Sequence, residues 1–228
     1  MKNIEMLKEK MSVYFVVGTQ DCGYSAERTL QIVEEALRGG AGTLQLRDKG
    51  SRLSAEERYA LGREMKEMCA RYGCLFFVND DVELAICLQA DGVHVGQEDM
   101  PLAKVRSLVG ENMLVGVSAG SVEEALAAQA GGADCLGVGA MYATSSKADA
   151  GEPIGPGVLS AIREAVGSDM PIVGIGGITV ENAPEVIDAG ADGVAVISAI
   201  SRAASPQEAA SALKRVVQSA IAARSGKA

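Results

Sequence analysis

Three long polar side chains occupy alternate positions in the stretch QLRDKG, residues 45–50. If this stretch ends a β-strand, Gln45, Arg47 and Lys49 share one face, because successive side chains of a strand point to opposite sides. A planar Arg fork beside a Lys ammonium suits the oxygens of a phosphate or diphosphate group. A buried network of salt bridges would use the same residues, so this stretch alone leaves both interpretations open.

Carboxylates follow two other short apolar runs, in the stretches FVNDD and GVHVGQED. Mg²⁺ takes few protein ligands and lets phosphate oxygens and water complete its octahedron, so two carboxylates beside two cations are typical of a magnesium–polyphosphate site. We therefore predict Asp80 and Asp99 as Mg²⁺ ligands. Helix capping is the alternative for Asp99, and Asp81 is interpreted as the N-terminal residue of a helix.

Other polar groups follow further apolar runs. His94 is the single histidine, so it cannot belong to a multi-histidine metal site; we predict contact with a substrate, and a packed structural histidine is the alternative. Ser118 follows the run LVGV. The longest loop, GAMYATSSKADAGEPIGPG, carries Thr144, Ser146 and Lys147 and fits either a mobile lid or an ordinary polar surface loop.

Glycine-rich or small-residue turns end the last two apolar runs, GIGGI and GVAVISAIS. Gly176 and Gly177 let the backbone approach a phosphate, and the N–H groups of Ile197 and Ser198 can donate from the other side. The sequence therefore predicts two anion sites, one cationic and metal-assisted for a diphosphate and one metal-free for a monophosphate.

Eight short apolar runs alternate with helix-like segments along the chain. Most runs are rich in Val, Ile or Phe and too short for a helix, which favours buried strands. They are VYFVV from Val13, TLQL from Thr43, LFFV from Leu75, GVHV from Gly92, LVGV from Leu114, CLGVG from Cys135, PIVGIG from Pro171 and GVAVI from Gly193. Eight strand–helix units predict an α/β fold, a single (β/α)₈ TIM-barrel domain over residues 1–228. An open, doubly wound parallel sheet is the alternative.

Local signals support this alternation. The stretches GGAGTLQL, LQADGVHV, GGADCLGV and AGADGVAV repeat one pattern, in which small residues and glycine end a helix before a strand begins. Ser54, Ser121 and Thr179 are predicted N-caps, and Glu57 and Glu124 complete capping boxes with the first two.

Composition argues against several classes of partner. The net charge of −9 argues against nucleic acid and anionic membranes as general partners. No stretch approaches the roughly 20 apolar residues of a transmembrane helix. Five cysteines without metal-type pairing predict reduced thiols and a cytoplasmic location. The oligomeric state stays open, a homo-oligomer included.

The motifs QLRDKG, VNDD, ADGVHVGQEDMP, GVS, ATSSK, GIGGI and VAVISAI resemble the thiamine-phosphate synthase family, also called thiamine-phosphate pyrophosphorylases, in order and spacing. The resemblance covers nearly the whole chain. It implies a (β/α)₈ transferase that joins two small molecules, hydroxymethylpyrimidine diphosphate and hydroxyethylthiazole phosphate, to give thiamine phosphate and diphosphate with Mg²⁺. It also implies a dissociative substitution, in which the leaving diphosphate is stabilised by Mg²⁺ and cationic side chains.

The resemblance further implies residue roles. The pyrimidine would be held by Gln45, Asn79 and His94. The diphosphate would be bound by Arg47, Lys49, Ser118 and Lys147, with Mg²⁺ on Asp80 and Asp99. The thiazole side would be lined by Thr144 and Ser146, and its phosphate held by Gly177, Ile197 and Ser198.

The chain departs from the usual family pattern at the end of its first strand, and there are two alternative functions. The first strand ends in VVGTQDCG where the family frequently has Thr-Asp, and no role is assigned to Thr19 or Gln20. A thiazole tautomerase-like paralogue is the alternative enzyme, but it needs no diphosphate cage. A non-catalytic sensor of phosphorylated metabolites is an alternative of another class, and no output domain supports it.

Overall fold

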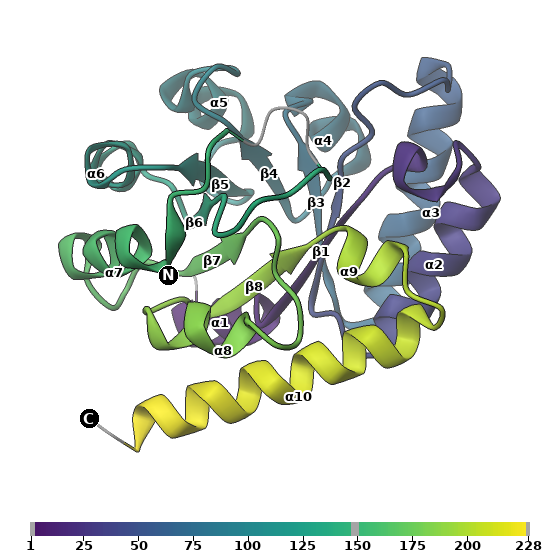
Figure 1. Ribbon diagram of the computed structural model, residues 1–228. Coiled ribbons are helices and arrows are strands. Elements are labelled where there is room, and N and C mark those ends of the chain that lie inside the picture. The colour runs from purple at the N-terminus through teal and green to yellow at the C-terminus, as the bar shows by residue number, and fades with distance from the viewer. Residues whose placement is uncertain (1–2, 147–150, 227–228) are drawn as a thin grey trace.

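Eight parallel strands close into a barrel in chain order in the computed structural model, which describes residues 3–146 and 151–226 (Figure 1). The strands are β1 (Val13–Val17), β2 (Thr43–Leu46), β3 (Leu75–Asn79), β4 (Gly92–Val95), β5 (Leu114–Ala119), β6 (Cys135–Gly139), β7 (Ile172–Ile175) and β8 (Gly193–Val196). The ring closes where β1 pairs with β8, with Val13 opposite Val194. The predicted (β/α)₈ barrel is confirmed, and the open-sheet alternative is wrong.

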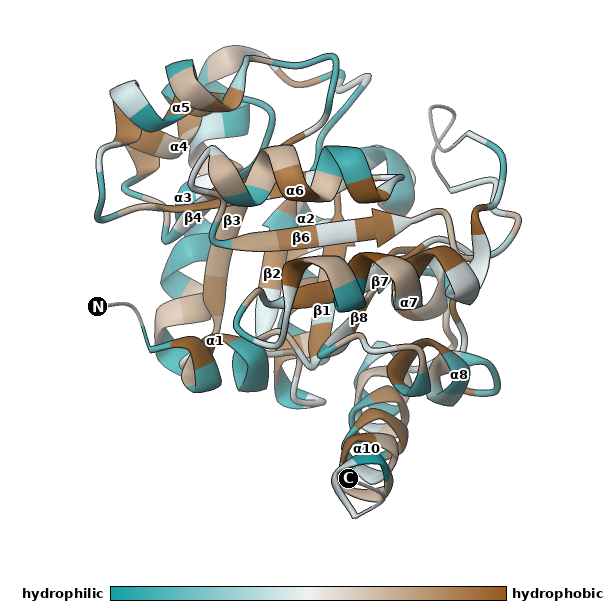
Figure 2. Cartoon of the chain, turned by 90° about the vertical axis from the view of Figure 1, so that its left-hand side faces the viewer, coloured by the Kyte–Doolittle hydropathy of each residue, from teal (hydrophilic) through white to brown (hydrophobic). Residues whose placement is uncertain are grey.

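Helices surround the barrel. They are α1 (Ile4–Lys10), the 3₁₀ helix η1 (Thr19–Cys22), α2 (Ala26–Arg38), α3 (Ala55–Tyr72), α4 (Val82–Leu88), α5 (Leu102–Val109), α6 (Val122–Ala130), α7 (Gly155–Val166), α8 (Ala183–Asp188), α9 (Ser198–Ser201) and α10 (Pro206–Ser225). The strands are coloured largely as hydrophobic between these helices (Figure 2). Among the described residues, no helix combines the length and apolar character that a membrane crossing requires.

The barrel interior is filled by side chains. Tyr14 and Phe77 pack inside it with ring centroids 5.7 Å apart, and Leu7 and Met11 from the α1 region join the same cluster. A second, larger core lies between the strands and the surrounding helices. Because the interior is packed, as is usual for this fold, a ligand has room only at an end of the barrel.

Two of the three predicted N-caps are confirmed. Ser54 forms a reciprocal capping box with Glu57. Ser121 caps α6, but the Glu124 carboxylate accepts from Gly120 N instead of completing a box. The Thr179 prediction is wrong, because α8 begins only at Ala183 and a turn precedes it.

Three of the four repeated stretches that precede strands carry an aspartate, and these aspartates make similar hydrogen bonds at the amino-terminal end of the barrel. Three aspartates, each just before an even-numbered strand, accept a hydrogen bond from a backbone N–H of the preceding strand. These bonds run from Phe76 to Asp91, from Val115 to Asp134 and from Ile172 to Asp192, at 2.8, 2.8 and 2.9 Å.

The five cysteines are free thiols, four of them buried and Cys87 exposed.

Candidate active site

A cavity of about 610 Å³ opens at the carboxyl-terminal ends of the strands. Nearly all of the predicted site residues line it: Arg47, Lys49, Asn79, Asp80, His94, Asp99, Ser118, Thr144, Ser146, Gly177, Ile197 and Ser198. They come from seven of the eight strand ends, which the closed barrel brings to one place. Lys147 lies outside the described residues, so its predicted role stays a prediction.

The cations after β2 lie at the rim of this cavity. The backbone N–H of Arg47 donates to Val17 O at 2.9 Å, which extends the pairing of β1 and β2 by one residue. The Arg47 side chain lines the cavity although the residue is only 6% exposed. Lys49 Nζ lies 2.8 Å from Asp80 Oδ2. A cation and a carboxylate from two strand ends therefore meet here.

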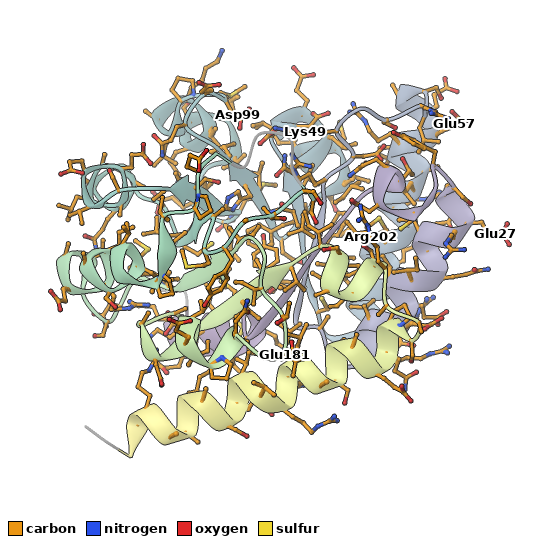
Figure 3. All side chains as sticks on the ribbon, in the orientation of Figure 1. Glu27, Lys49, Glu57, Asp99, Glu181 and Arg202 are labelled. Atoms are coloured by element: carbon orange, nitrogen blue, oxygen red, sulfur yellow. The ribbon has the colours of Figure 1, made fainter. Side chains whose placement is uncertain are left out.

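Asp80 and Asp99 face each other across the ends of β3 and β4. Burial raises the pKa of Asp80, the Lys49 ammonium opposes this rise, and the neighbouring Asp99 carboxylate adds to it. Asp80 has a φ of 61°, and its N–H donates to His94 O at 2.8 Å, so the chain is turned sharply where this carboxylate emerges. Lys49 and Asp99 lie at the same end of the barrel (Figure 3).

The capping alternative for Asp99 is wrong. Helix α5 has Pro101 at its N-cap and no side-chain cap, whereas Asp99 Oδ2 accepts from Gly96 N at 2.8 Å within the loop that precedes it. The interpretation of Asp81 is confirmed, because it caps α4 by accepting from Leu84 N at 2.9 Å.

The Asp80–Asp99 pair suits a hard divalent cation. Within the described residues, no cluster of three or more His, Cys, Asp or Glu side chains could hold a metal. A pair of half-buried carboxylates, close enough for one to raise the pKa of the other, instead fits Mg²⁺, which often keeps one or two protein carboxylates and completes its shell with phosphate oxygens and water.

His94 points into the barrel, as its place in β4 predicted. Its Nε2 and Ser118 Oγ lie 2.9 Å apart. Glycines on the next two strands make room for the ring: an added Cβ would lie 2.5 Å from His94 Nδ1 at Gly116 and 3.0 Å from Cε1 at Gly137. Gln97, which is not among the residues predicted from the sequence, also lines the cavity and donates to Ser118 O at 2.6 Å.

Gln45 lies deeper than the other predicted residues. It shares the inward face of Arg47, but it is 3% exposed and is absent from the described residues that line the cavity. Its Nε2 donates to the Tyr14 hydroxyl at 2.9 Å, inside the barrel. Alternation along a strand predicts direction and leaves depth open, so a pyrimidine contact by Gln45 stays a prediction.

The glycine turn after β7 lies on the opposite side of the cavity. Gly176 and Gly177 have φ values of 103° and 64°, in the region that favours glycine. Asn182 Nδ2 donates to Gly177 O at 3.0 Å and holds the turn. Ser146 and Ser198 are joined by a hydroxyl–hydroxyl bond of 3.0 Å, which links the loop after β6 to α9.

Comparison with known proteins agrees with this geometry. The model of a family described as thiamine monophosphate synthase matches residues 13–200. The chain belongs to this family. It is accordingly an enzyme of the transferase class, as the resemblance implied.

Individual relatives in this family match three quarters or more of the chain. A thiamine-phosphate synthase of Geobacillus thermodenitrificans is 52% identical over 217 residues, which are 95% of this chain and 96% of the relative. One from Methanospirillum hungatei is 51% identical over 171 residues, 75% of this chain and 81% of the relative. The structure of thiamine phosphate pyrophosphorylase from Pyrococcus furiosus matches with a TM-score of 0.84 and 37% identity, over 94% of this chain and 99% of that one.

Proposed function

We propose that this chain is a thiamine-phosphate synthase that joins hydroxymethylpyrimidine diphosphate to hydroxyethylthiazole phosphate and releases diphosphate. One observation carries the proposal. Arg47, Lys49, Asp80 and Asp99 converge on one rim of a cavity whose opposite side is a glycine turn beside the start of α9. Such a cavity offers a charged, metal-competent site for a diphosphate and a backbone site for a monophosphate.

The diphosphate side would work by charge stabilisation. Arg47 would bind oxygens bidentately, and Lys49 would contribute its charge, with Ser118 donating nearby. Asp80 and Asp99 would hold Mg²⁺, which when bound neutralises negative charge on the departing diphosphate. Lys147 would add a third cation from the loop after β6.

The substitution itself exchanges one bond for another. The bond between the pyrimidine methylene carbon and the diphosphate oxygen breaks, and its electron pair leaves with the diphosphate. The lone pair of the thiazole nitrogen then forms the new carbon–nitrogen bond, so no general base is required. Asn79 and His94 would orient the pyrimidine, with Gln45 beneath them in the barrel.

The thiazole phosphate would occupy the other side of the cavity. The backbone N–H groups of Gly177, Ile197 and Ser198 are suited to phosphate oxygens. Thr144 and Ser146 would line the thiazole, and both already border the cavity. The two substrates would then meet between the two anion sites.

The tautomerase-like alternative is not favoured. That reaction needs a phosphate site and acid–base chemistry, but it has no use for a diphosphate cage. The carboxylate pair and the two cations at the rim would have no function in it, whereas the synthase reaction uses all four.

The direct test is to incubate the purified protein with both substrates and Mg²⁺ and to measure thiamine phosphate and diphosphate. We expect equal amounts of both products, and none when either substrate is omitted or the metal is chelated. Folded protein that forms neither product would overturn the proposal. Isomerisation of a thiazole phosphate without diphosphate release would favour the tautomerase instead.

A further inference from the structure

The loop after β1, residues 18–24, contacts the end of β2 at several points. Asp48 Oδ1 accepts two hydrogen bonds from Thr19, from its backbone N at 2.8 Å and from its hydroxyl at 2.6 Å. Gln20 Nε2 donates to Arg47 O at 2.7 Å. Further along, the Arg52 guanidinium lies 3.8 Å from the centroid of the Tyr24 ring.

The close approach of the two loops depends on Gly18. A Cβ at this position would overlap the carbonyl oxygen of Arg47. The loop is also braced internally, because Asp21 Oδ2 accepts from Gly18 N at 3.0 Å and from Gln20 Nε2 at 2.9 Å. The groups that contact the end of β2 are therefore held in place themselves.

Asp48 stands between two residues that line the cavity, Arg47 and Lys49. Arg47 and Lys49 border it, whereas Thr19, Gln20 and Asp48 are absent from its described lining. Thr19 is 1% exposed, so its bonds to the Asp48 carboxylate are shielded from water, and hydrogen bonds to a charged acceptor are the stronger kind. Fixing Asp48 and the carbonyl of Arg47 sets the direction in which the flanking side chains leave the backbone.

We propose that Thr19 is a positioning residue that acts through Asp48 to aim Arg47 and Lys49 at the diphosphate. The inference rests on the proposed function, in which these two cations bind that group. A long cationic side chain on a backbone that can shift has to be ordered when the phosphate binds, and this ordering lowers the binding affinity. A side chain on a fixed backbone avoids part of that cost. The loop after β1 supplies this order without touching the substrate.

The test compares Thr19→Val with Thr43→Val. Thr43 is equally buried and its hydroxyl donates to Lys10 O at 3.0 Å, but it lies at the opposite end of β2. Both variants lose one buried hydroxyl bond, so similar losses of thermal stability are expected. Only Thr19→Val is expected to lower kcat/KM for the pyrimidine diphosphate, by about tenfold or more. A loss of this size is typical when a hydrogen bond that orients a binding residue is removed.

Three further measurements make the result specific. The KM for thiazole phosphate should stay unchanged in Thr19→Val, because that substrate binds across the cavity. Thr19→Ser retains the hydroxyl and should restore the parent value. The affinity for inorganic diphosphate with Mg²⁺, measured by calorimetry, should fall in Thr19→Val and be unchanged in Thr43→Val.

Diphosphate affinity separates this inference from the proposed function. Parent-like diphosphate affinity and kinetics in Thr19→Val would overturn the positioning role, even if the parent makes thiamine phosphate. If the parent makes none and Thr19→Val alone still loses diphosphate affinity, the positioning role stands and the proposed function falls.

Discussion

At the residue scale, the site depends on opposite charges held close together at the rim of the cavity. Asp80 interacts with both Lys49 and Asp99, and burial raises its pKa. Two carboxylates that share a site repel each other, and a nearby cation relieves that repulsion. This arrangement supports the proposed binding of a divalent ion together with the phosphate oxygens that would complete its shell.

Replacement of Asp99 by Asn tests the metal assignment. Asp99→Asn removes one carboxylate while keeping an oxygen that can accept from Gly96 N. We expect the Mg²⁺ concentration for half-maximal activity to rise by at least about tenfold. A titration of activity with Mg²⁺ measures this change.

The matched control is Asp81→Asn, one residue from Asp80. It removes a charge and the ion pair with Arg58, but Asn retains the helix cap. The Mg²⁺ requirement should stay close to that of the parent. An equal shift in both variants would mean that net charge, and not direct ligation by Asp99, sets metal affinity.

At the element scale, the loops after the strands depend on a few backbone positions. The turn after β7 reaches its shape through positive φ values that glycine adopts without strain, and Asn182 then holds it against α8. Because the proposed phosphate contacts are backbone N–H groups, the shape of the turn matters more than its side chains.

The variant Gly177→Ala tests that dependence. A Cβ there would lie 2.7 Å from Ala143 O, and the φ of 64° disfavours any other residue. We expect a strain of about 1–3 kcal/mol, seen as a raised KM for thiazole phosphate at saturating pyrimidine diphosphate.

Gly157→Ala is the control for this glycine. It lies in α7, has open space around an added Cβ, and should leave the KM unchanged while slightly stabilising the helix. If Gly177→Ala binds thiazole phosphate as well as the parent does, the turn is not the phosphate site.

At the scale of the whole molecule, the two ends of the barrel have different tasks. The carboxyl-terminal end carries the cavity, whereas the amino-terminal end carries the three aspartates that tie neighbouring strands together. Asp192 accepts from Ile172 N and from Arg163 Nη2, the latter at 2.6 Å, and is 9% exposed. This division matches the usual separation of catalysis and stability in such barrels.

Asp192→Asn should lower stability without changing the chemistry. Loss of one partner leaves the Arg163 guanidinium short of a counter-ion, and we expect unfolding to become easier by about 3 kcal/mol. Denaturation by urea measures the free energy of unfolding, and kcat/KM at a temperature below the transition should match the parent.

The matched control is Asp188→Asn, which removes the same charge from an exposed position. Asp188→Asn should leave both stability and kinetics nearly unchanged. A kinetic defect in Asp192→Asn, measured while the protein is fully folded, would contradict the separation of the two ends.

Much of the fold could be predicted from the sequence because the signals for strands and helix caps are local. Short apolar runs, most of them rich in Val, Ile or Phe, predicted all eight strands, and the Ser54 capping box needed only residues three positions apart. The Thr179 prediction was wrong because a Thr before a helical segment can begin a turn as easily as a helix: its hydroxyl accepts from Glu181 N, and α8 follows with Asn182 as its N-cap.

The sequence by itself determined which residues end each strand and which way they point, since alternation along a strand is a property of the backbone. Only the tertiary structure decided distances between residues far apart in the chain. Pairing of neighbouring strands brings Asp80 towards Asp99 and sets Thr19 against Asp48, and packing of the loop after β6 against α9 joins Ser146 to Ser198. These contacts depend on how strands pair and how loops pack, so they join residues of different elements, and the pattern within one element does not give their distances.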